Sequence, residues 1–325
     1  MADTAGGAVE QRKQSRQPAP DECLARALES LEGLASGDAF GECFLNPWDR
    51  TPENRAARML PPAPWRFTDD TMMAVSVYAC LERHGSMEPE WLAESFARHY
   101  DPERGYGPAM NALLMRLYTI GAENWFEEAQ ELFNGGGSFG NGAAMRVAPV
   151  GAYFAHNLDL VVEQATLSAI STHCHPEAIA GAIAVAIAAA IAWQDRDAVT
   201  PMYAKAFLER VRACTPESVV RDGIDRALEL PDAMTALEAA LTIGNGSHTT
   251  AQDTVPFVLW SAARSLNSFE DALWETVNGG GDVDTNCAIV GGIVAMRTGS
   301  GAVPAEWLRR REALGPLLQA AMKKY

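Results

Sequence analysis

Apolar side chains recur at helical spacing along almost all of this 325-residue chain. A repeat of three to four residues marks the buried face of an amphipathic helix, whereas a half-buried strand alternates at every second residue. No sustained two-residue alternation bounded by hairpin turns occurs, so few strands are expected. The segments with the helical repeat are DECLARALESLEGLASGDAFGECF, TMMAVSVYACLERHG, EWLAESFARHY, NWFEEAQELF, LVVEQATLSAISTHCHPEAIAG, AMTALEAALTIGN, VPFVLWSAARSL, FEDALWETVN and AEWLRRREALGPLLQAAMKK. Because no long linker or repeat separates them, the sequence predicts one large all-α domain, an orthogonal helical bundle over residues 21–325.

The N-terminus and the longest apolar run bear on location. Residues 1–20 lack a basic start followed by an apolar stretch, so they are not a secretory signal and are expected to form a disordered tail. The run AIAGAIAVAIAAAIAW, Ala178–Trp193, is mostly alanine and shorter than the ~20 residues that span a membrane. It is expected to form a central buried helix, and no membrane association is expected.

Charge and cysteine content exclude further classes. The net charge of −16 disfavours a nucleic-acid or anionic-membrane surface, which needs clustered Lys and Arg. A hydrophobic content of 48% excludes a wholly disordered chain. The cysteines lack CxxC spacing, and most lie in apolar helical patterns, so reduced core thiols in a cytoplasmic protein are expected. They are Cys23, Cys43, Cys80, Cys174, Cys214 and Cys287. The protein is also expected to be a monomer.

Two clusters of one hydroxyl and two carboxylates stand where apolar helices are predicted to begin. They comprise Thr68, Asp69 and Asp70 in one case and Asp282, Asp284 and Thr285 in the other. Capping explains each cluster taken alone, because a hydroxyl accepts from free N–H groups and acids in a first turn favour the helix dipole. If the two helix starts face each other, however, four carboxylates converge and require cations between them. Oxygen ligands suit Mg²⁺, Mn²⁺ or Ca²⁺ rather than zinc, and two clusters suggest two ions.

Five sequence blocks occur in one order: GDAFGE from Gly37, FTDDT from Phe67, GSFGNGAAMRVAPVG from Gly137, STHCHPEAIAGA from Ser171 and GGDVDTNCAIVGGIVA from Gly280. Together they resemble the ADP-ribosylglycohydrolase family, from about Leu24 to Arg297. The resemblance implies an all-α fold with a dinuclear Mg²⁺ or Mn²⁺ site at its centre, and removal of ADP-ribose from modified side chains. The family's metal ligands correspond here to Thr68, Asp69, Asp70, Asp282, Asp284 and Thr285. Thr285 is expected both to ligate and to cap its helix.

The glycine-rich segment GGGSFG, residues 135–140, fits the dinucleotide fingerprint GxGxxG. Its context is wrong, because a helical pattern precedes it and no βαβ unit follows. A plain flexible turn is one alternative. The resemblance favours another, in which the backbone N–H groups of the loop cradle the diphosphate of ADP-ribose and Phe139 stacks on the adenine or packs against the ribose. The cradle would consist of Gly137, Ser138, Gly140, Asn141 and Gly142.

The run His173-Cys174-His175 permits several interpretations. Zinc binding is disfavoured because no second Cys/His cluster accompanies it, and a Cys174 nucleophile would need an oriented base. On a partly buried helix, His173 can simply be a hydrogen-bonded core residue. The resemblance favours His173 as a pocket residue that contacts the ribose or phosphate, with His175 structural.

Glu42 and Asp38 lie four residues apart and would share one face of a helix. Solvated surface acids are one explanation. Many members of the family carry a glutamate a few residues later, where Leu45 stands here. We assign Glu42 as general acid/base or metal ligand, with the metal-bound Asp69 as the other candidate for the catalytic group.

These assignments predict a Mg²⁺-dependent hydrolase. Cleavage at the anomeric carbon passes through an oxocarbenium-like state, and two ions can hold the ribose hydroxyls and lower the pKa of an attacking water. The substrate would be an ADP-ribosylated protein or a small ADP-ribose conjugate, linked through arginine, serine or a nucleobase. A non-catalytic ADP-ribose-binding module is the alternative. The acids of both clusters count against a purely structural protein on the same fold.

Overall fold

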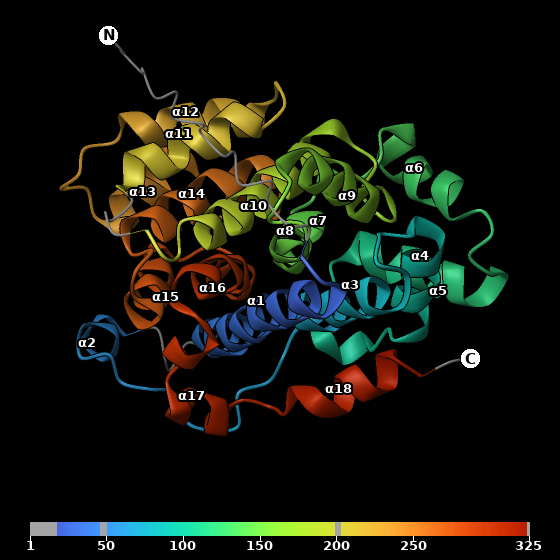
Figure 1. The fold of residues 1–325 in the computed structure, drawn as a ribbon, viewed down its shortest axis with the longest axis horizontal. Coiled ribbons are helices and arrows are strands. Elements are labelled where there is room, and N and C mark those ends of the chain that lie inside the picture. The colour runs from blue at the N-terminus through green and yellow to red at the C-terminus, as the bar shows by residue number, and fades with distance from the viewer. Residues whose placement is uncertain (1–17, 46–50, 199–202, 324–325) are drawn as a thin grey trace, which may run out of the picture.

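The computed structural model describes residues 18–45, 51–198 and 203–323, whose fold is drawn in Figure 1. Every regular element in these ranges is a helix, and extended backbone contributes only two isolated bridges, Trp65 with Arg311 and Gly140 with Thr250. The predicted all-α fold is confirmed. Most of the expected tail, residues 1–20, lies outside the described residues, and the last residue of that segment already begins the first helix.

The helices follow one another along the chain with short connections. Up to the glycine loop they are α1 (Pro20–Glu42), η1 (Cys43–Leu45), α2 (Pro52–Ala56), α3 (Asp69–His84), α4 (Pro89–Arg98), η3 (Pro102–Arg104), α5 (Pro108–Ile120) and α6 (Trp125–Gly135). The middle of the chain forms α7 (Gly142–Met145), α8 (Ala148–Tyr153), α9 (Leu158–Ile170), α10 (Pro176–Gln194), α11 (Ala204–Cys214), α12 (Val219–Glu229) and α13 (Ala236–Ile243). The C-terminal part forms α14 (Ala251–Arg264), α15 (Phe269–Gly279), α16 (Val283–Thr298), η4 (Ser300–Ala302), α17 (Ala305–Arg310) and α18 (Leu314–Ala321).

The helices α1 and α16 lie side by side near the centre of the molecule (Figure 1). Glycines at every fourth position of α1, Gly33, Gly37 and Gly41, face α16. A Cβ atom built on Gly37 would lie 2.0 Å from the carbonyl oxygen of Cys287, and one on Gly41 would lie 2.5 Å from that of Val283. The two backbones are therefore closer than side chains would permit, and the last turn of α1 is held against the first turn of α16.

Aromatic side chains also pack the end of α1 against α17 and the segment before α3. Phe40 stacks on Trp307 of α17 with ring centroids 4.1 Å apart, and it lies 5.6 Å from the ring of Trp65. Such pairs bury large apolar areas in a defined geometry. They belong to one connected core of buried apolar residues that extends from Cys23 to Ala321.

The predicted central helix is present as α10. Its 19 residues, with a mean hydropathy of 1.8, are long and apolar enough to cross a membrane. The expectation that length alone excludes a membrane span was therefore wrong, because the helix begins at Pro176, before the alanine-rich run. Burial is the better argument against a membrane span. Of the most apolar stretch of α10, 78% is buried inside the protein, where the helix packs against α7, α8, α9 and α14.

The apolar pattern from Leu160 to Gly181 does not form one helix. α9 ends at Ile170, and α10 begins at Pro176. Proline lacks the N–H that a continuing helix needs, and it disfavours helical backbone in the preceding residue. His173 consequently lies in a turn between two helices, not on a helix as expected.

Gly37→Ala is expected to lower the free energy of unfolding by about 1–3 kcal/mol, the range for an overpacked core. The added methyl group would meet the Cys287 carbonyl and push α16 away from α1. Gly315→Ala is the matched control, because no atom lies within 4 Å of a Cβ at that position. Urea unfolding of both variants and the parent measures the effect. A Gly37→Ala midpoint equal to that of the parent would contradict the close approach of the two helices.

Candidate functional site

The helix α3 begins at the first acidic cluster. Thr68 is its N-cap, and the Thr68 Oγ1 accepts a hydrogen bond from the backbone N–H of Asp70 at 3.4 Å. The capping interpretation is thus confirmed for Thr68. The carboxylate of Asp70 is buried with its Oδ2 2.7 Å from Thr68 Oγ1, whereas Asp69 is half-buried beside Gly105.

A carboxylate of α1, Asp38, holds the start of α3 in place. It is fully buried and accepts hydrogen bonds from the backbone N–H groups of Thr68 (3.0 Å) and Thr71 (3.1 Å). The hydroxyl groups of the same two threonines also donate to it. Hydrogen bonds to a carboxylate are among the stronger ones in proteins. The sequence pattern had indicated Asp38 only as a helix neighbour of Glu42, so this positioning residue was missed.

The second acidic cluster opens α16. Asp282 is the N-cap residue, but its side chain makes no capping hydrogen bond, and its Oδ2 accepts from Nδ2 of Asn141 at 2.7 Å. Asp284 and Thr285 are buried in the first turn. The Oγ1 of Thr285 lies 3.5 Å from Oδ2 of Asp70, on the other helix start. The expected capping role of Thr285 was therefore wrong, while the two helix starts do meet.

Glycines before α16 let the chain turn tightly onto the segment 244–250. Gly280 (φ 66°) and Gly281 (φ 77°) have left-handed backbone that favours glycine. A Cβ on Gly281 would lie 2.0 Å from the carbonyl oxygen of Asn245, which also accepts from Nδ2 of Asn286 at 2.8 Å. The segment 244–250 is thus part of the site, although no sequence pattern had pointed to it.

Several buried oxygens at this meeting point have no hydrogen-bond partner within the described part of the chain. They are Asp70 Oδ1, Asp284 Oδ1 and Asn286 Oδ1. A buried acceptor without a partner costs about 1–3 kcal/mol, and more when it is charged. As the side chains lie, no three carboxylate, imidazole or thiol groups of the described residues stand at chelating distance from one another. The cluster is therefore rich in oxygen and short of donors, without forming a closed cage of three acids.

Burial and mutual repulsion raise the pKa values of these carboxyl groups. Burial, followed by the charge of Asp38, raises the pKa of Asp69 to about 8 and that of Asp70 well above its usual range. Burial and the charge of Asp282 do the same for the pKa of Asp284. For Asp38, burial raises the pKa to about 6 although hydrogen bonds from its two threonine partners lower it. Without a cation, the cluster therefore retains protons near neutral pH.

Glu42 is the last residue of α1 and is half-buried. Burial and the nearby charge of Asp38 raise its pKa, and Arg66 partly offsets them. Its own charge contributes to the raised pKa of Asp69 and Asp284, so Glu42 lies within electrostatic range of both acidic clusters. Its catalytic role stays a prediction.

The glycine loop is hydrogen-bonded to the segment 244–250 and to the first residue of α14. The backbone N–H of Asn141 donates to the carbonyl oxygen of Thr249 at 3.1 Å, and the carbonyl of Phe139 accepts from the N–H of Ala251 at 3.0 Å. Thr249 has φ 51°, a strained conformation for a β-branched residue. A short helix, α7, follows the loop, and no strand flanks it in the described ranges, so the loop is not part of a dinucleotide-binding βαβ unit.

His173 lies directly behind the glycine loop. A Cβ on Gly142 would lie 2.8 Å from its ring, and one on Gly140 would lie 3.3 Å from it. The ring is buried with Nδ1 2.7 Å from Oγ1 of Thr172. Burial, and after it the charge of Arg146, lowers the pKa of His173 to about 3, so the imidazole is neutral at physiological pH.

The neighbours of His173 have structural roles. Nδ1 of His175 accepts from the backbone N–H of Glu177 at 3.1 Å and caps α10. The thiol of Cys174 donates to the carbonyl of Ile170 at 3.3 Å, and burial raises its pKa to about 11. A thiol with so high a pKa supplies little thiolate, which counts against a nucleophilic role.

Phe139 lies between two other rings. Its centroid is 5.3 Å from that of Phe133 and 5.5 Å from that of His175. Phe133 is 53% exposed, and its φ of 54° interrupts the end of α6, an unusual backbone for a bulky residue. Phe133 is thus a further candidate for ligand contact that helical periodicity did not single out.

Over residues 19–324 the chain matches the family model described as ADP-ribosylglycohydrolase. It belongs to the ADP-ribosylglycohydrolase family. Membership confirms the resemblance seen in the five sequence blocks. The chain is accordingly a glycohydrolase, and at the level of the family its activity is ADP-ribosyl hydrolysis.

Relatives cover most of this glycohydrolase. ADP-ribosylhydrolase ARH3 of Homo sapiens is 28% identical, over 87% of this chain and 89% of its own length. An uncharacterised protein of Archaeoglobus fulgidus is 30% identical, over 90% of this chain and 93% of its own. ADP-ribosylarginine hydrolase Tri1 of Pseudomonas putida is 25% identical, over 90% of this chain and 75% of its own length. A solved structure titled ADP-ribosylglycohydrolase-related protein complex is 26% identical, with a TM-score of 0.64 over 93% of this chain and 97% of that one.

In EDTA, this glycohydrolase is expected to lose stability as the pH rises from about 6.5 to 8. Unfolded carboxyl groups are fully ionised in that range, whereas folded Asp69 keeps its proton up to about pH 8. The folded state then binds more protons, so its stability falls with rising pH. Below pH 6.5 the lowered pKa of His173 has the opposite effect, because unfolded histidine binds a proton there and folded His173 does not. The fall in stability is therefore expected above pH 6.5. Thermal unfolding at constant ionic strength measures the slope.

Asp69→Asn is the control for this pH dependence. It removes one of the raised carboxyl groups and should make the slope shallower. A melting temperature that rises between pH 6.5 and 8 in EDTA, or an unchanged slope in the variant, would contradict the raised pKa of Asp69.

Proposed function

We propose that this protein is a divalent-cation-dependent hydrolase that cleaves the glycosidic bond between ADP-ribose and an acceptor. The observation that supports this most strongly is that the two acidic helix starts meet beside the glycine loop. Asn141 links these parts, because its backbone belongs to the loop and its side chain donates to Asp282. A diphosphate bound on the loop would therefore bring its ribose close to the carboxylates.

Two Mg²⁺ ions, with Mn²⁺ as the alternative, fit the donor set of this site. The proposed ligands are Thr68, Asp69, Asp70, Asp282, Asp284 and Thr285. All of them offer oxygen, which hard cations prefer, and the buried Oδ1 atoms of Asp70 and Asp284 have no other described partner. When bound, such ions lower the pKa of a coordinated water and polarise ribose hydroxyls.

The chain's own residues would bind and orient the substrate. The segment Gly137–Gly142 offers backbone N–H groups to the diphosphate. Phe139, with Phe133 beside it, offers ring faces to the adenine. The neutral imidazole of His173 can exchange a hydrogen bond with the ribose or phosphate without adding charge to the site.

A half-buried carboxyl group is suited to the proton transfers. Glu42 has a raised pKa and borders the cluster, so it can protonate the leaving acceptor or accept a proton from the attacking water. Asp69 is the alternative, since it lies at the start of α3 beside the other carboxylates. Both assignments place proton transfer at the junction of α1 and α3.

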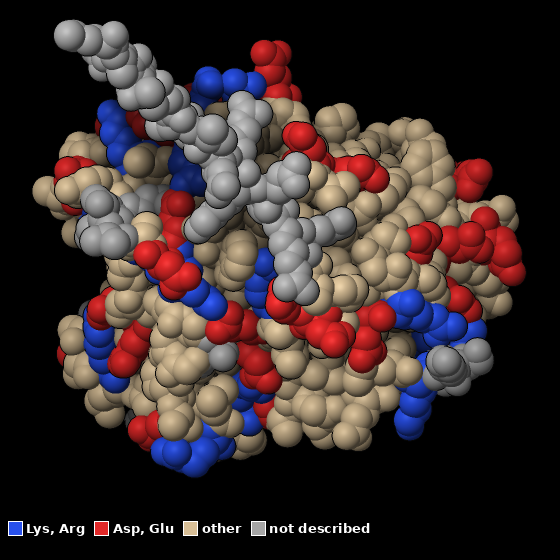
Figure 2. Space-filling view, viewed as in Figure 1, with Lys and Arg blue, Asp and Glu red and all other residues tan. Residues whose placement is uncertain are grey.

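The substrate proposed is an ADP-ribosylated protein or a small ADP-ribose conjugate, with arginine, serine and nucleobase linkages to be compared. We further propose a cytoplasmic monomer without membrane or nucleic-acid partners. All six cysteines are free thiols, which suits a reducing compartment. On the face shown in Figure 2, Lys and Arg side chains occur in small separate groups among the acids, which suits the absence of a nucleic-acid surface.

Incubation with arginine-, serine- and nucleobase-linked ADP-ribose tests the proposed activity. We expect release of free ADP-ribose from at least one substrate, lost in EDTA and restored by Mg²⁺. Asp284→Asn should abolish both this release and the stabilisation by Mg²⁺, about 2.7 kcal/mol at one hundred times Kd for the parent. The exposed Asp232→Asn should retain both. Folded protein that binds ADP-ribose and Mg²⁺ but releases nothing from any substrate would contradict the proposal and indicate a binding module.

The same assay separates the roles of Glu42. Glu42→Gln is expected to lower turnover by about 10²- to 10⁴-fold, the range for a proton-transfer group, with unchanged affinity for ADP-ribose. If Glu42 instead ligates a cation, the loss would be accompanied by weaker Mg²⁺ binding and partly reversed by excess Mg²⁺. Turnover equal to the parent at limiting Mg²⁺ would exclude both roles and leave Asp69 as the catalytic candidate.

A further inference from the structure

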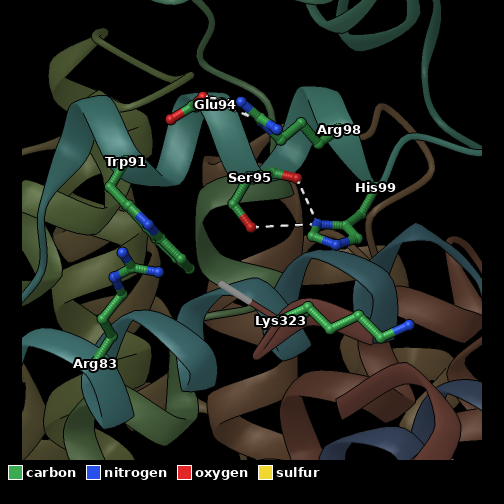
Figure 3. Close-up of a pocket in the computed structure, with 8 residues that line it drawn as sticks. Arg83, Trp91, Glu94, Ser95, Arg98, His99 and Lys323 are labelled. Atoms are coloured by element: carbon green, nitrogen blue, oxygen red, sulfur yellow. Dashed lines mark hydrogen bonds and ion pairs between the residues drawn. The ribbon is translucent and has the colours of Figure 1, made fainter. Parts of the chain in front are cut away.

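Arg146 carries a positive charge into the protein interior. It follows the last turn of α7, and its side chain is fully buried. Arg98 on α4 is of the ordinary surface kind, since it pairs with Glu94 and both side chains are nearly half exposed (Figure 3). Phe96 lies on the same helix, and the centroid of its ring is 4.5 Å from Cζ of Arg146. Burial lowers the pKa of Arg146 to about 9, so the guanidinium is still charged at physiological pH.

The atoms that this guanidinium contacts are neutral. Nη2 donates to the carbonyl oxygen of Ser168 at 2.8 Å and to Oγ of Ser171 at 3.2 Å, at the end of α9. Nη1 lies 3.8 Å from Sδ of Met73, and Nε is buried without a partner in the described part of the chain. Asp69 lies within electrostatic range of Arg146, but it is itself a proposed cation ligand. Arg146 therefore has no carboxylate of its own.

Capping of α9 explains these hydrogen bonds but not the charge. A neutral side-chain amide could donate to the same oxygens. A buried charge without an ionic partner is unfavourable, because hydrogen bonds to neutral groups only partly replace its hydration. The negative end of α9 offsets about half of one charge. The rest of the positive charge is available to stabilise an anion nearby.

The guanidinium lies behind the glycine loop. Arg146 comes four residues after Gly142, about 6 Å along α7 at 1.5 Å per residue. Through Ser171 it holds the turn that carries His173, whose ring packs directly behind Gly140 and Gly142. Burial, and after it the charge of Arg146, lowers the pKa of His173. The electrostatic effect of Arg146 thus reaches the back of the loop.

The loop itself supplies no charge to balance a diphosphate. Residues 137–142 contain neither Lys nor Arg. The side chain of Asn141 binds the carboxylate of Asp282, which would repel phosphate groups. Charges in the protein interior interact more strongly and are screened less than charges in water. A fully buried cation behind the loop can therefore act on a bound anion that it does not touch.

We propose that Arg146 stabilises the diphosphate of ADP-ribose on the glycine loop through its charge, acting across the turn that carries His173. This inference rests on the proposed function, because it requires ADP-ribose to bind at residues 137–142. It assigns Arg146 to recognition of the charge of the ligand and not to bond cleavage. Loss of this charge should therefore raise the KM for ADP-ribosylated substrates more than it lowers kcat.

Calorimetric titration of ADP-ribose into the full chain at saturating Mg²⁺ tests this proposal. Arg146→Gln keeps a neutral donor and should weaken binding about tenfold, whereas Arg146→Lys keeps the charge and should bind within about twofold of the parent. Adenosine has no phosphate and should bind equally to all three proteins. Arg83→Gln removes the same charge from the exposed far end of α3 and should have no effect.

A purely structural role for Arg146 predicts a different pattern. Equal losses in Arg146→Gln and Arg146→Lys, or equal losses of ADP-ribose and adenosine binding in Arg146→Gln, would overturn the proposal. Unchanged binding of ADP-ribose to Arg146→Gln would overturn it as well. If Arg146→Gln is unfolded at the assay temperature, Arg146→Met provides a neutral side chain of similar length. None of these results would contradict the hydrolase activity, whereas a parent that does not bind ADP-ribose would contradict both proposals.

Discussion

Carboxylates from α1, α3 and α16 lie within electrostatic range of one another in the protein interior, and each raises the pKa of its neighbours. Such an arrangement is unfavourable by itself, because burial and like charge both oppose ionisation. Close packing and hydrogen bonds in the surrounding fold hold these groups next to one another. Cations between the carboxylates would turn that unfavourable arrangement into binding energy, which is the physical basis of the proposed metal site.

One short segment of α1 makes several of these contacts. In the block GDAFGE, Gly37 allows the backbone contact with α16, and Asp38 accepts hydrogen bonds from the start of α3. Phe40 packs on Trp307 of α17, and Glu42 completes the block at the edge of the acidic cluster. This one block of helix thus sets the position of both acidic helix starts.

Much of this site could be predicted from local patterns. Helical periodicity indicated the all-α fold, and a hydroxyl with two acids ahead of an apolar run located both helix starts. The two helix starts meet although Thr285 and Asp70 are 215 residues apart in the sequence. This meeting was expected from the family resemblance and from the argument that four converging acids need cations. Periodicity alone carries no information about which distant helices are neighbours.

The features that the sequence did not reveal depend on contacts or backbone conformations that helical periodicity does not encode. Asp38 lies within an apolar helical pattern, and the sequence does not distinguish a buried carboxylate there from a solvated one. Only the glycines at every fourth position indicate which face of α1 contacts α16. The turn at His173 was indicated by Pro176, which the apolar pattern outweighed. Phe133 and Thr249 have left-handed backbone, which bulky and β-branched residues disfavour, so their residue types did not indicate it.

The most direct test of the proposed metal site is anomalous X-ray diffraction from crystals of this protein grown with Mn²⁺. Two manganese peaks are expected between the start of α3 and the start of α16, within coordination distance of Asp70 and Asp284. In crystals of Asp284→Asn grown in the same way, at least one peak should disappear. Manganese found only elsewhere in the molecule, or no peak between the two helix starts at saturating Mn²⁺, would contradict a cation site between the carboxylates.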